Sequence, residues 1–318
     1  MTGEQITKAE SITTTATYRA ADVVAAFLAQ LDRMPATTTA YKYNLRPFVA
    51  WLDGEGLTID RVTPRDVLAY KEHLQATKKP TTVSAYLTAV RRLYAWVERE
   101  TGYPNPARSV EGSRGLNKGG TSKARDVLTH SQARAVASHE EAGLAGLRNR
   151  AMVNLMLVDA LRTIEVVRLN VADYRQMGTA RVIAIQGKGH ATADTIKVVP
   201  EDTAELLDAY LKARGDVAED APLFAATSNR NKGGRMTTRA INGIVKNTMR
   251  AEGIDSPRLT AHSLRHSAVT YAVEAGADLM EAQTFARHLD PKTTTIYIHT
   301  REALRGTYEN HVAAVLAC

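Results

Sequence analysis

The stretch that says most about fold and chemistry is residues 262–266, which read His-Ser-Leu-Arg-His, followed by His288 and Tyr297. Arg162 and Lys188 lie upstream. Guanidiniums bind phosphate oxygens in pairs, an ammonium can act as a point charge or an acid, and a phenol can attack phosphorus and form a covalent ester. Together these side chains predict chemistry on a phosphodiester.

Each motif also has an ordinary explanation when it is taken alone. Arg162 and Glu165 are three residues apart and can share a helical face, either as a surface ion pair or as a phosphate-binding arginine oriented by the glutamate. Lys188 between two glycines is either a turn lysine or a group that enters a DNA groove and protonates a leaving oxygen. His262 and Arg265 have the same three-residue spacing, so both can face one site.

The size and composition of the chain indicate a two-domain globular protein. Its 318 residues correspond to roughly two domains of about 150 residues, and the hydrophobic content of 44 % is ordinary. The single cysteine, Cys318, allows no intramolecular disulfide, which fits a cytoplasmic protein. We expect no membrane span, because there is no run of about 18 apolar residues, and no secretory signal in the threonine-rich residues 1–20.

Positive charge is unevenly distributed along the chain. The net charge is +7, and residues 61–125 alone hold thirteen Lys or Arg against five Asp or Glu. Residues 228–250 carry six basic residues and no acid. This pattern indicates a nucleic-acid partner, although a solvated basic surface would look the same. The basic residues that we expect to contact DNA are Lys118, Lys123, Arg125, Arg230, Lys232, Arg235 and Arg239.

The first third of the chain reads as a helical module at residues 18–108. Apolar residues at helical spacing predict helices over 20–31 and 39–52, and Pro64 and Pro80 begin two more, of which the last ends near residue 100. A flexible tail at residues 1–17 precedes the module. Four glycines and four basic residues at 111–125 predict a flexible linker over 109–125 that follows a polyanion.

The remainder, residues 126–318, reads as helices around a small sheet. A capping signal at Thr129–Gln132 predicts the first helix, and alternating residues at 181–186 and 195–199 predict a β-hairpin with Lys188 at its turn. The fold class is therefore mainly α with a small β-sheet. The further helices that we expect lie at about 147–159, 201–214, 237–252, 261–275, 277–287 and 301–315.

The sequence indicates neither a metal nor a cofactor. No spacing of ligands suggests zinc, no acidic trio suggests a two-metal nuclease, and no serine-hydrolase elbow is present.

The order Arg162, Lys188, His262-x-x-Arg265, His288 and Tyr297 resembles the tyrosine recombinase, or phage integrase, family, most closely its Xer-type and integron- or transposon-borne branches. The resemblance covers about residues 18–315. It implies a two-domain DNA clamp, in which 18–108 form a four-helix core-binding domain with SAM-like fold and 126–318 the catalytic domain.

This sequence departs from the family pattern at two positions. Ala160 stands where the first arginine box often has glycine, and Arg287 stands before His288, where glycine is usual. The first change is minor. The second either brings a cation to the DNA or alters the packing of the segment that carries Tyr297.

The resemblance implies site-specific DNA strand exchange through a 3′-phosphotyrosine on Tyr297, with Lys188 as general acid. It also implies that Arg162, Arg265 and His288 stabilise the phosphate, and that His262 assists removal of the proton from Tyr297. Four protomers would act on two duplexes, and the helix at about 301–317 would pack on a neighbouring protomer or on its own domain. A topoisomerase-like strand transferase and a non-catalytic DNA-binding regulator remain the alternatives.

Overall fold

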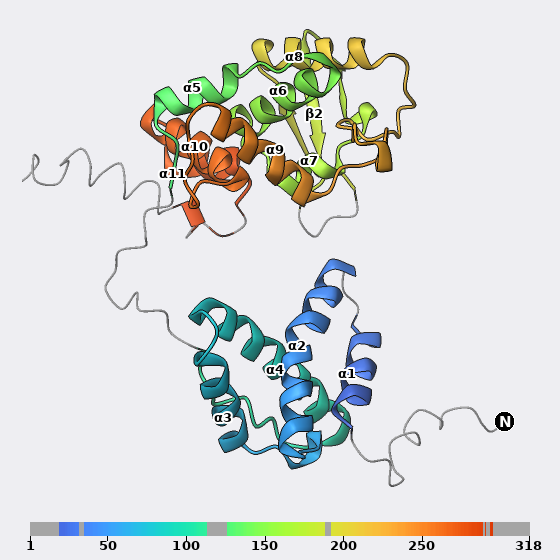
Figure 1. Cartoon of the computed structure of the whole chain (residues 1–318), viewed down its shortest axis with the longest axis vertical. Helices are drawn as coiled ribbons and strands as arrows, with labels where there is room; N and C mark the ends of the chain where they lie inside the picture. Colours follow the sequence, from blue (N-terminus) through green and yellow to red (C-terminus); the bar gives the residue numbers. More distant parts are fainter. Residues whose placement is uncertain are drawn as a thin grey trace, which may run out of the picture. The chain divides into compact units, whose positions relative to one another are not determined.

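The structure is a computed structural model that describes residues 19–31, 35–112, 126–187, 192–288, 290 and 293–294. The chain divides into two compact units, residues 1–121 and 122–318, and each is described by itself (Figure 1). Several predicted features lie outside the described residues. They are the tail at 1–17, the basic linker residues Lys118, Lys123 and Arg125, the hairpin lysine Lys188, Tyr297 and the helix at 301–315.

The N-terminal unit consists of the four predicted helices. Thr63 caps α3 in a capping box with Asp66, and a proline occupies the first turn of this helix. Gly102, with a φ of 75°, ends α4 in the left-handed conformation that glycine adopts without strain. The helices are α1 (Ala20–Ala29), α2 (Pro35–Glu55), α3 (Pro64–Gln75) and α4 (Pro80–Thr101).

Aromatic side chains fill the centre of this unit. The Phe48 ring lies 5.0 Å from the Tyr70 ring and 6.1 Å from the Tyr94 ring, both edge-on. Tyr94 also donates its hydroxyl to the carbonyl of Ile59 at 3.2 Å. The clearest difference from the predicted helices is at α2, which begins four residues earlier than expected and ends three residues later, at Glu55. The early start is at Pro35, since proline is well suited to a first helical position.

The C-terminal unit contains seven described helices and a three-stranded sheet. Thr129 and Gln132 form the predicted capping box at the start of the first helix. No described helix of the chain is long and apolar enough to span a membrane. The helices are α5 (His130–Ser138), α6 (Gly143–Val158), α7 (Thr163–Arg168), α8 (Glu201–Arg214), α9 (Thr238–Ala251), α10 (Ala261–Glu274) and α11 (Leu279–Ala286).

The sheet is an antiparallel meander of β1 (Tyr174–Met177), β2 (Ala180–Ile185) and β3 (Thr195–Val198). The predicted hairpin is confirmed, with Ile183 of β2 opposite Lys197 of β3. Strand β1 was not predicted. It has four residues, of which only the first is buried, so the alternation that marks a half-buried strand is absent.

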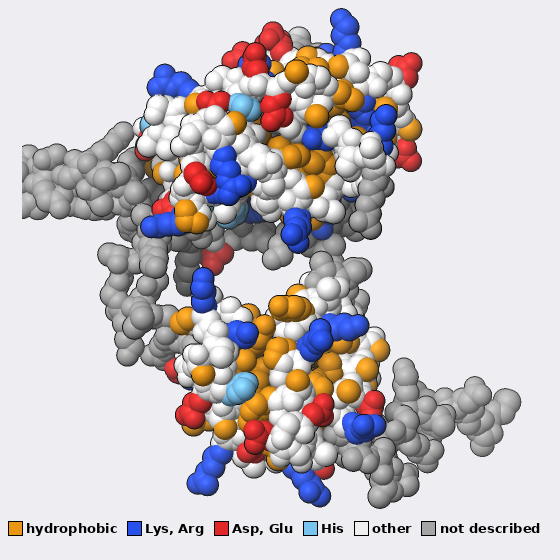
Figure 2. Space-filling model, viewed as in Figure 1, with side chains coloured by type: hydrophobic (Ala, Val, Ile, Leu, Met, Phe, Trp, Pro, Cys, Tyr) orange, Lys and Arg blue, Asp and Glu red, His pale blue; other side chains and the backbone are white. Residues whose placement is uncertain are grey.

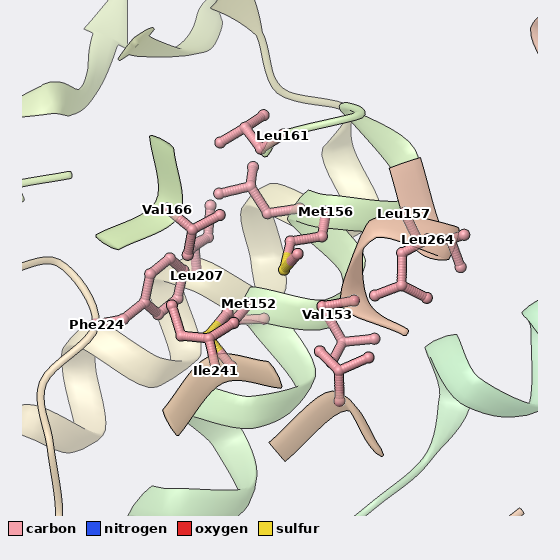
Figure 3. Close-up of a cluster of buried hydrophobic side chains, with 14 of the residues drawn as sticks. Met152, Val153, Met156, Leu157, Leu161, Val166, Leu207, Phe224, Ile241 and Leu264 are labelled. Carbon is pink, nitrogen blue, oxygen red and sulfur yellow. The ribbon is translucent and has the colours of Figure 1, made fainter. Parts of the chain in front are cut away.

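Helix α6 is the centre of the C-terminal unit. Its buried residues occur on all sides, as expected of a helix enclosed by other elements. It packs against α8 and α10, and Figure 1 shows it between the sheet and the α10–α11 pair. Met152, Val153, Met156 and Leu157 of α6 meet side chains of α7, α8, α9 and α10 in one apolar cluster (Figure 3). This core gives the surrounding loops a rigid base.

The start of the C-terminal unit is attached directly to α10. The backbone N–H of Leu128 donates to the hydroxyl of Ser267 at 2.8 Å, and the Tyr271 hydroxyl donates to the carbonyl of Leu128 at 2.6 Å. Both partners belong to α10, the helix that carries the His-Ser-Leu-Arg-His motif.

Candidate active site

Two left-handed turns carry the segments that matter most to the site. Ala160, with a φ of 54°, lies between α6 and Arg162, and Arg287, with a φ of 50°, lies between α11 and His288. They are the non-glycine residues with positive φ among the described part of the chain. An L-residue in this conformation costs roughly 1–2 kcal/mol, so the surrounding contacts must hold both turns in place. This conformation explains why glycine would suit both positions.

Arg265 braces the two turns. Its side chain is 1 % exposed, and its two terminal nitrogens donate to the carbonyls of Ala160 and Ala286. These carbonyls belong to segments that are far apart in sequence. The arginine of the His-x-x-Arg motif is therefore a structural link as well as a positive charge in the site.

Arg162 is the residue that caps α7, and it is paired with Glu165. The Glu165 carboxylate accepts from the Arg162 Nη1 at 2.7 Å and from the Arg162 backbone N–H at 2.7 Å. The other terminal nitrogen, Nη2, donates to the carbonyl of Arg287 at 3.0 Å. The predicted Arg162–Glu165 contact is thus present, and Arg162 is also joined to the second turn.

Arg287 shares the same carboxylate. Its Nη2 donates to Oε2 of Glu165 at 2.5 Å. Although burial alone would raise the pKa of Glu165, the positive charges of Arg287 and Arg162 and their hydrogen bonds outweigh it, so this pKa lies below its ordinary value. Glu165 is therefore an ionised carboxylate between two guanidiniums.

His288 follows the second turn and is held on two sides. Its backbone N–H donates to the Gln283 carbonyl at 3.1 Å, and Gln283 returns a hydrogen bond from Nε2 to the His288 carbonyl at 3.0 Å. The Nδ1 of the imidazole lies 2.9 Å from the hydroxyl of Thr294, a residue that is 0 % exposed. These contacts fix His288 next to the segment that leads to Tyr297.

His262 lies on α10, three residues before Arg265. It is exposed, whereas His266 on the next turn is buried, and the two imidazole rings meet edge-on with centroids 4.2 Å apart. Thr260 caps the helix, with its backbone N–H donating to the Ser263 hydroxyl at 3.1 Å. The motif therefore presents one exposed histidine beside a buried arginine.

Lys197 of β3 is a member of this cluster that the sequence analysis missed. Its ammonium donates to the carbonyl of Asp159 at 2.6 Å and to that of Phe285 at 3.2 Å, and lies 4.1 Å from the centre of the Phe285 ring. Burial, aided by the charge of Arg287, lowers the pKa of Lys197 to about 7. The alternation of β3, which points Lys197 to the face opposite Ile196 and Val198, was the available signal.

Asp159, at the end of α6, is the second buried carboxylate here. It is 3 % exposed, and one of its oxygens, Oδ2, has no hydrogen-bond partner in the described structure. Burial raises the pKa of Asp159 to about 6, against the opposing effects of Lys197 and Arg287. The cluster thus contains four basic side chains and two carboxylates.

The hairpin that carries Lys188 is anchored at its base. The Gly187 backbone N–H donates to the Asp194 carboxylate at 2.7 Å, and Arg168 at the end of α7 donates to the Gly187 carbonyl at 3.0 Å. The ends of the hairpin loop are therefore fixed next to α7. Lys188 and Tyr297 are themselves outside the described residues, so their positions in the site stay predictions.

The predicted DNA contacts at 230–239 differ from one another. Arg235 donates to the carbonyls of Val167 and Leu169 at 2.6 and 3.1 Å and to Oδ1 of Asn170 at 2.5 Å, so it supports the segment after α7. Lys232 and Arg239 are exposed. For all of these, and for Arg230, contact with DNA stays a prediction. Lysines and arginines are scattered with acidic residues on the visible faces of both units (Figure 2).

The arrangement suits the binding of a phosphate group. Main-chain carbonyls and one shared carboxylate hold four basic side chains near one another, those of Arg162, Arg265, Arg287 and Lys197. His288 follows the second turn and lies beside them. Guanidiniums in fixed positions stabilise the charge that develops on phosphate oxygens. In the described part of the chain, no group of three His, Cys, Asp or Glu side chains could hold a metal ion.

Models of two known protein domains match most of the chain. The model of the phage integrase family matches residues 126–303, and that of the phage integrase N-terminal SAM-like domain matches residues 24–101. Among curated relatives, the tyrosine recombinase XerD of Yersinia pestis is 29 % identical over 283 residues, which cover 86 % of this chain and 90 % of the relative. XerD of Ralstonia nicotianae is 28 % identical over 284 residues, covering 86 % and 87 %.

Solved structures show the same fold. A XerH site-specific recombinase bound to palindromic difH substrate, in a post-cleavage complex, superposes with a TM-score of 0.71 at 19 % identity, covering 86 % of this chain and 80 % of that one. The family model at 126–303 spans more than half of the chain.

Proposed function

The chain belongs to the phage integrase family and is a tyrosine-type site-specific DNA recombinase, and from that premise we propose which residues perform strand cleavage. Tyr297 attacks the scissile phosphate and forms a 3′-phosphotyrosine, while the 5′-oxygen leaves. Arg162, Arg265 and His288 stabilise the charge on the phosphate oxygens. The ester keeps the energy of the broken bond, so a 5′-hydroxyl from another duplex can reverse the step.

This proposal is supported mainly by the meeting of three segments around Arg265: α10 itself, the turn at Ala160 and the turn at Arg287. Arg265 of α10 donates to carbonyls on both left-handed turns, and Arg162 beyond the first turn donates to the carbonyl of Arg287 in the second. A segment that continues from His288 through the buried Thr294 leads to Tyr297 three residues later. A phosphate bound by the two arginines would therefore lie near the start of that segment.

We assign proton transfers to Lys188 and His262. Lys188, on the loop whose base is anchored next to α7, would protonate the departing 5′-oxygen. The exposed His262, one helical turn from Arg265, would assist removal of the proton from Tyr297. Neither step requires a metal ion or another cofactor.

The partner is double-stranded DNA, and we propose that both units contact it. The N-terminal domain at 18–108 and the catalytic domain at 126–318 would hold one duplex between them, with the basic segment at 109–125 along the backbone. Lys118, Lys123 and Arg125 would contribute phosphate contacts there. Four protomers would act on two duplexes in the cytoplasm, with the helix at about 301–317 packed on a neighbouring protomer.

The first experiment tests the nucleophile. A nicked suicide substrate traps the covalent protein–DNA adduct, and Tyr297→Phe should lose the adduct while its gel-shift affinity stays within a few-fold of wild type. Tyr271→Phe, which removes a phenol of α10 outside the cluster, is the matched control and should keep the adduct. Adduct formation by the Tyr297 variant would refute the assignment. Exchange between two marked duplexes would measure the complete recombination reaction directly.

A second experiment tests the linker contacts. Six to ten phosphate contacts would weaken binding by about 10³–10⁵ between 50 and 200 mM salt. Neutralising Lys118, Lys123 and Arg125 together should reduce the slope of log affinity against log salt by up to about three units. An unchanged slope would show that this segment does not follow the DNA backbone.

A further inference from the structure

Arg287 is a basic residue of the cluster to which the proposed cleavage mechanism assigns no role. It occupies a left-handed turn that glycine would adopt without strain, yet its long side chain is only 11 % exposed. Two of its nitrogens, Nε and Nη1, are buried without a hydrogen-bond partner in the described structure. Burying a cation with unsatisfied donors is unfavourable. Neither the left-handed turn nor the unsatisfied nitrogens stabilise the fold, and features of this kind are common at functional sites.

The guanidinium of Arg287 is joined to Arg162 through a closed ring of contacts. Arg162 donates from Nη1 to Oε1 of Glu165 and from Nη2 to the carbonyl of Arg287. Arg287 donates from its own Nη2 to Oε2 of Glu165, which closes the ring. A glycine at residue 287 would keep the carbonyl contact but would leave the carboxylate to Arg162 alone.

Because Arg162 and Arg287 share the Glu165 carboxylate, more positive charge remains for the substrate. A carboxylate paired with one guanidinium offsets its charge almost completely, whereas one carboxylate between two guanidiniums leaves a net charge of one. Asp159 is a second buried carboxylate nearby, and it interacts with Lys197 and Arg287. Without Arg287, the charge of Glu165 would fall on Arg162 alone.

We propose that Arg287 is a positioning residue for strand cleavage, which neutralises Glu165 so that Arg162 is held by this carboxylate and still keeps its charge for the scissile phosphate. The inference rests on the proposed role of Arg162. Arg287 acts through Glu165 and Arg162, and its effect falls on the cleavage step and not on the affinity for DNA, which depends on many phosphate contacts.

The test measures single-turnover cleavage of a suicide substrate by the full-length protein. Arg287→Met keeps the length of the side chain without its charge and should slow cleavage about tenfold, the effect of one interaction of moderate strength. DNA affinity should stay within about twofold. Arg287→Lys, which keeps the charge, should recover most of the rate.

A double variant separates this role from a purely structural one. If Arg287 serves to neutralise Glu165, then Glu165→Gln should raise the cleavage rate of Arg287→Met several-fold, because the carboxylate that Arg287 neutralises has been removed. A double variant no faster than Arg287→Met would overturn the inference. So would wild-type cleavage by Arg287→Met.

Arg287→Gly guards against misfolding, because glycine suits the left-handed turn. It should be at least as resistant to thermal unfolding as wild type and yet cleave as slowly as Arg287→Met. A stable glycine variant with the wild-type rate would refute the inference. Arg162→Ala tests the underlying assignment separately: cleavage at the wild-type rate by this variant would refute the role of Arg162, whereas an inactive Arg162→Ala beside a fully active Arg287→Met refutes only the role of Arg287.

Discussion

The turns at Ala160 and Arg287 share a backbone conformation, with φ values of 54° and 50°, but they differ in what their side chains do. The methyl group of Ala160 is fully buried in a small apolar cluster with residues such as Val269 and Ala282. The side chain of Arg287 instead reaches a carboxylate on α7. One turn is packed like ordinary core, and the other carries a charge into the site.

The comparison shows that the two turns depend on each other. Arg265 donates to carbonyls at both, and Lys197 also joins the same two segments, through the carbonyls of Asp159 and Phe285. Backbone strain of this kind persists where neighbouring contacts fix it, and it is commonly found at functional sites. Five variants test whether the turns form one unit.

Arg265→Ala should have the largest effect, because it removes the brace from both turns. Cleavage should fall about 10²–10³-fold, the usual scale for the loss of one transition-state donor. Two buried carbonyls would also lose their partner, at about 1–3 kcal/mol each in the free energy of unfolding.

Arg162→Ala is the matched control for that variant. It should lose a similar factor in cleavage but less stability, because Glu165 keeps Arg287 as a partner. Urea unfolding measures the stability of both variants. Equal losses of stability would contradict the view that Arg265 holds the turns together.

Lys197 should give a smaller effect that depends on pH. Burial lowers the pKa of this lysine from 10.5 to about 7 in the folded protein. Between these values the unfolded chain binds the additional proton, so the free energy of unfolding should rise with pH, by at most about 1.4 kcal/mol per unit. Lys197→Met should lack this rise. Parallel stability curves for the two proteins between pH 7 and 9 would show that burial between the turns does not lower the pKa of Lys197.

The smallest expected effects are changes in the free energy of unfolding when glycine replaces the residue at each turn. Arg287→Gly should raise the free energy of unfolding by about 1 kcal/mol, because relief of left-handed strain and removal of two unsatisfied buried nitrogens outweigh the entropy cost of glycine and the lost ion pair with Glu165. At Ala160 the same relief is offset by the loss of a buried methyl group, worth about 0.8 kcal/mol. Ala160→Gly should therefore change stability by less than about 0.5 kcal/mol. A larger gain at Ala160 than at Arg287 would reverse the distinction between the turns.

Much of the fold could be predicted because it follows local patterns. Helical periodicity and capping residues identified the described helices of the N-terminal unit, and the capping box at Thr129 and the hairpin of β2 and β3 were also correct. Strand β1 was missed because three of its four residues are exposed. The spacing of Arg162 and Glu165 predicted their contact, which is local in the chain.

The long-range part of the site could not be predicted. Arg265, Lys197 and Arg235 donate to main-chain carbonyls, which every residue has, so no residue type marks the partner. The contact between Arg287 and Glu165 joins residues that are 122 positions apart. The glycine-like conformation of Arg287 was suggested by the family pattern, but the destination of its side chain depends on the packing of α7 against the second turn.

The attachment of Leu128 to α10 has a mechanical consequence. A force that pulls the chain at Asp126 away from the C-terminal unit would load the ion pair between Asp126 and Arg258, and then the hydrogen bonds from Leu128 to Ser267 and from Tyr271 to Leu128. Ser267 and Tyr271 are both on the helix that carries Arg265, beyond that residue in sequence. Tension at the start of this unit is therefore transmitted to the helix that braces both turns as well as to the apolar core, to which the Leu128 side chain belongs.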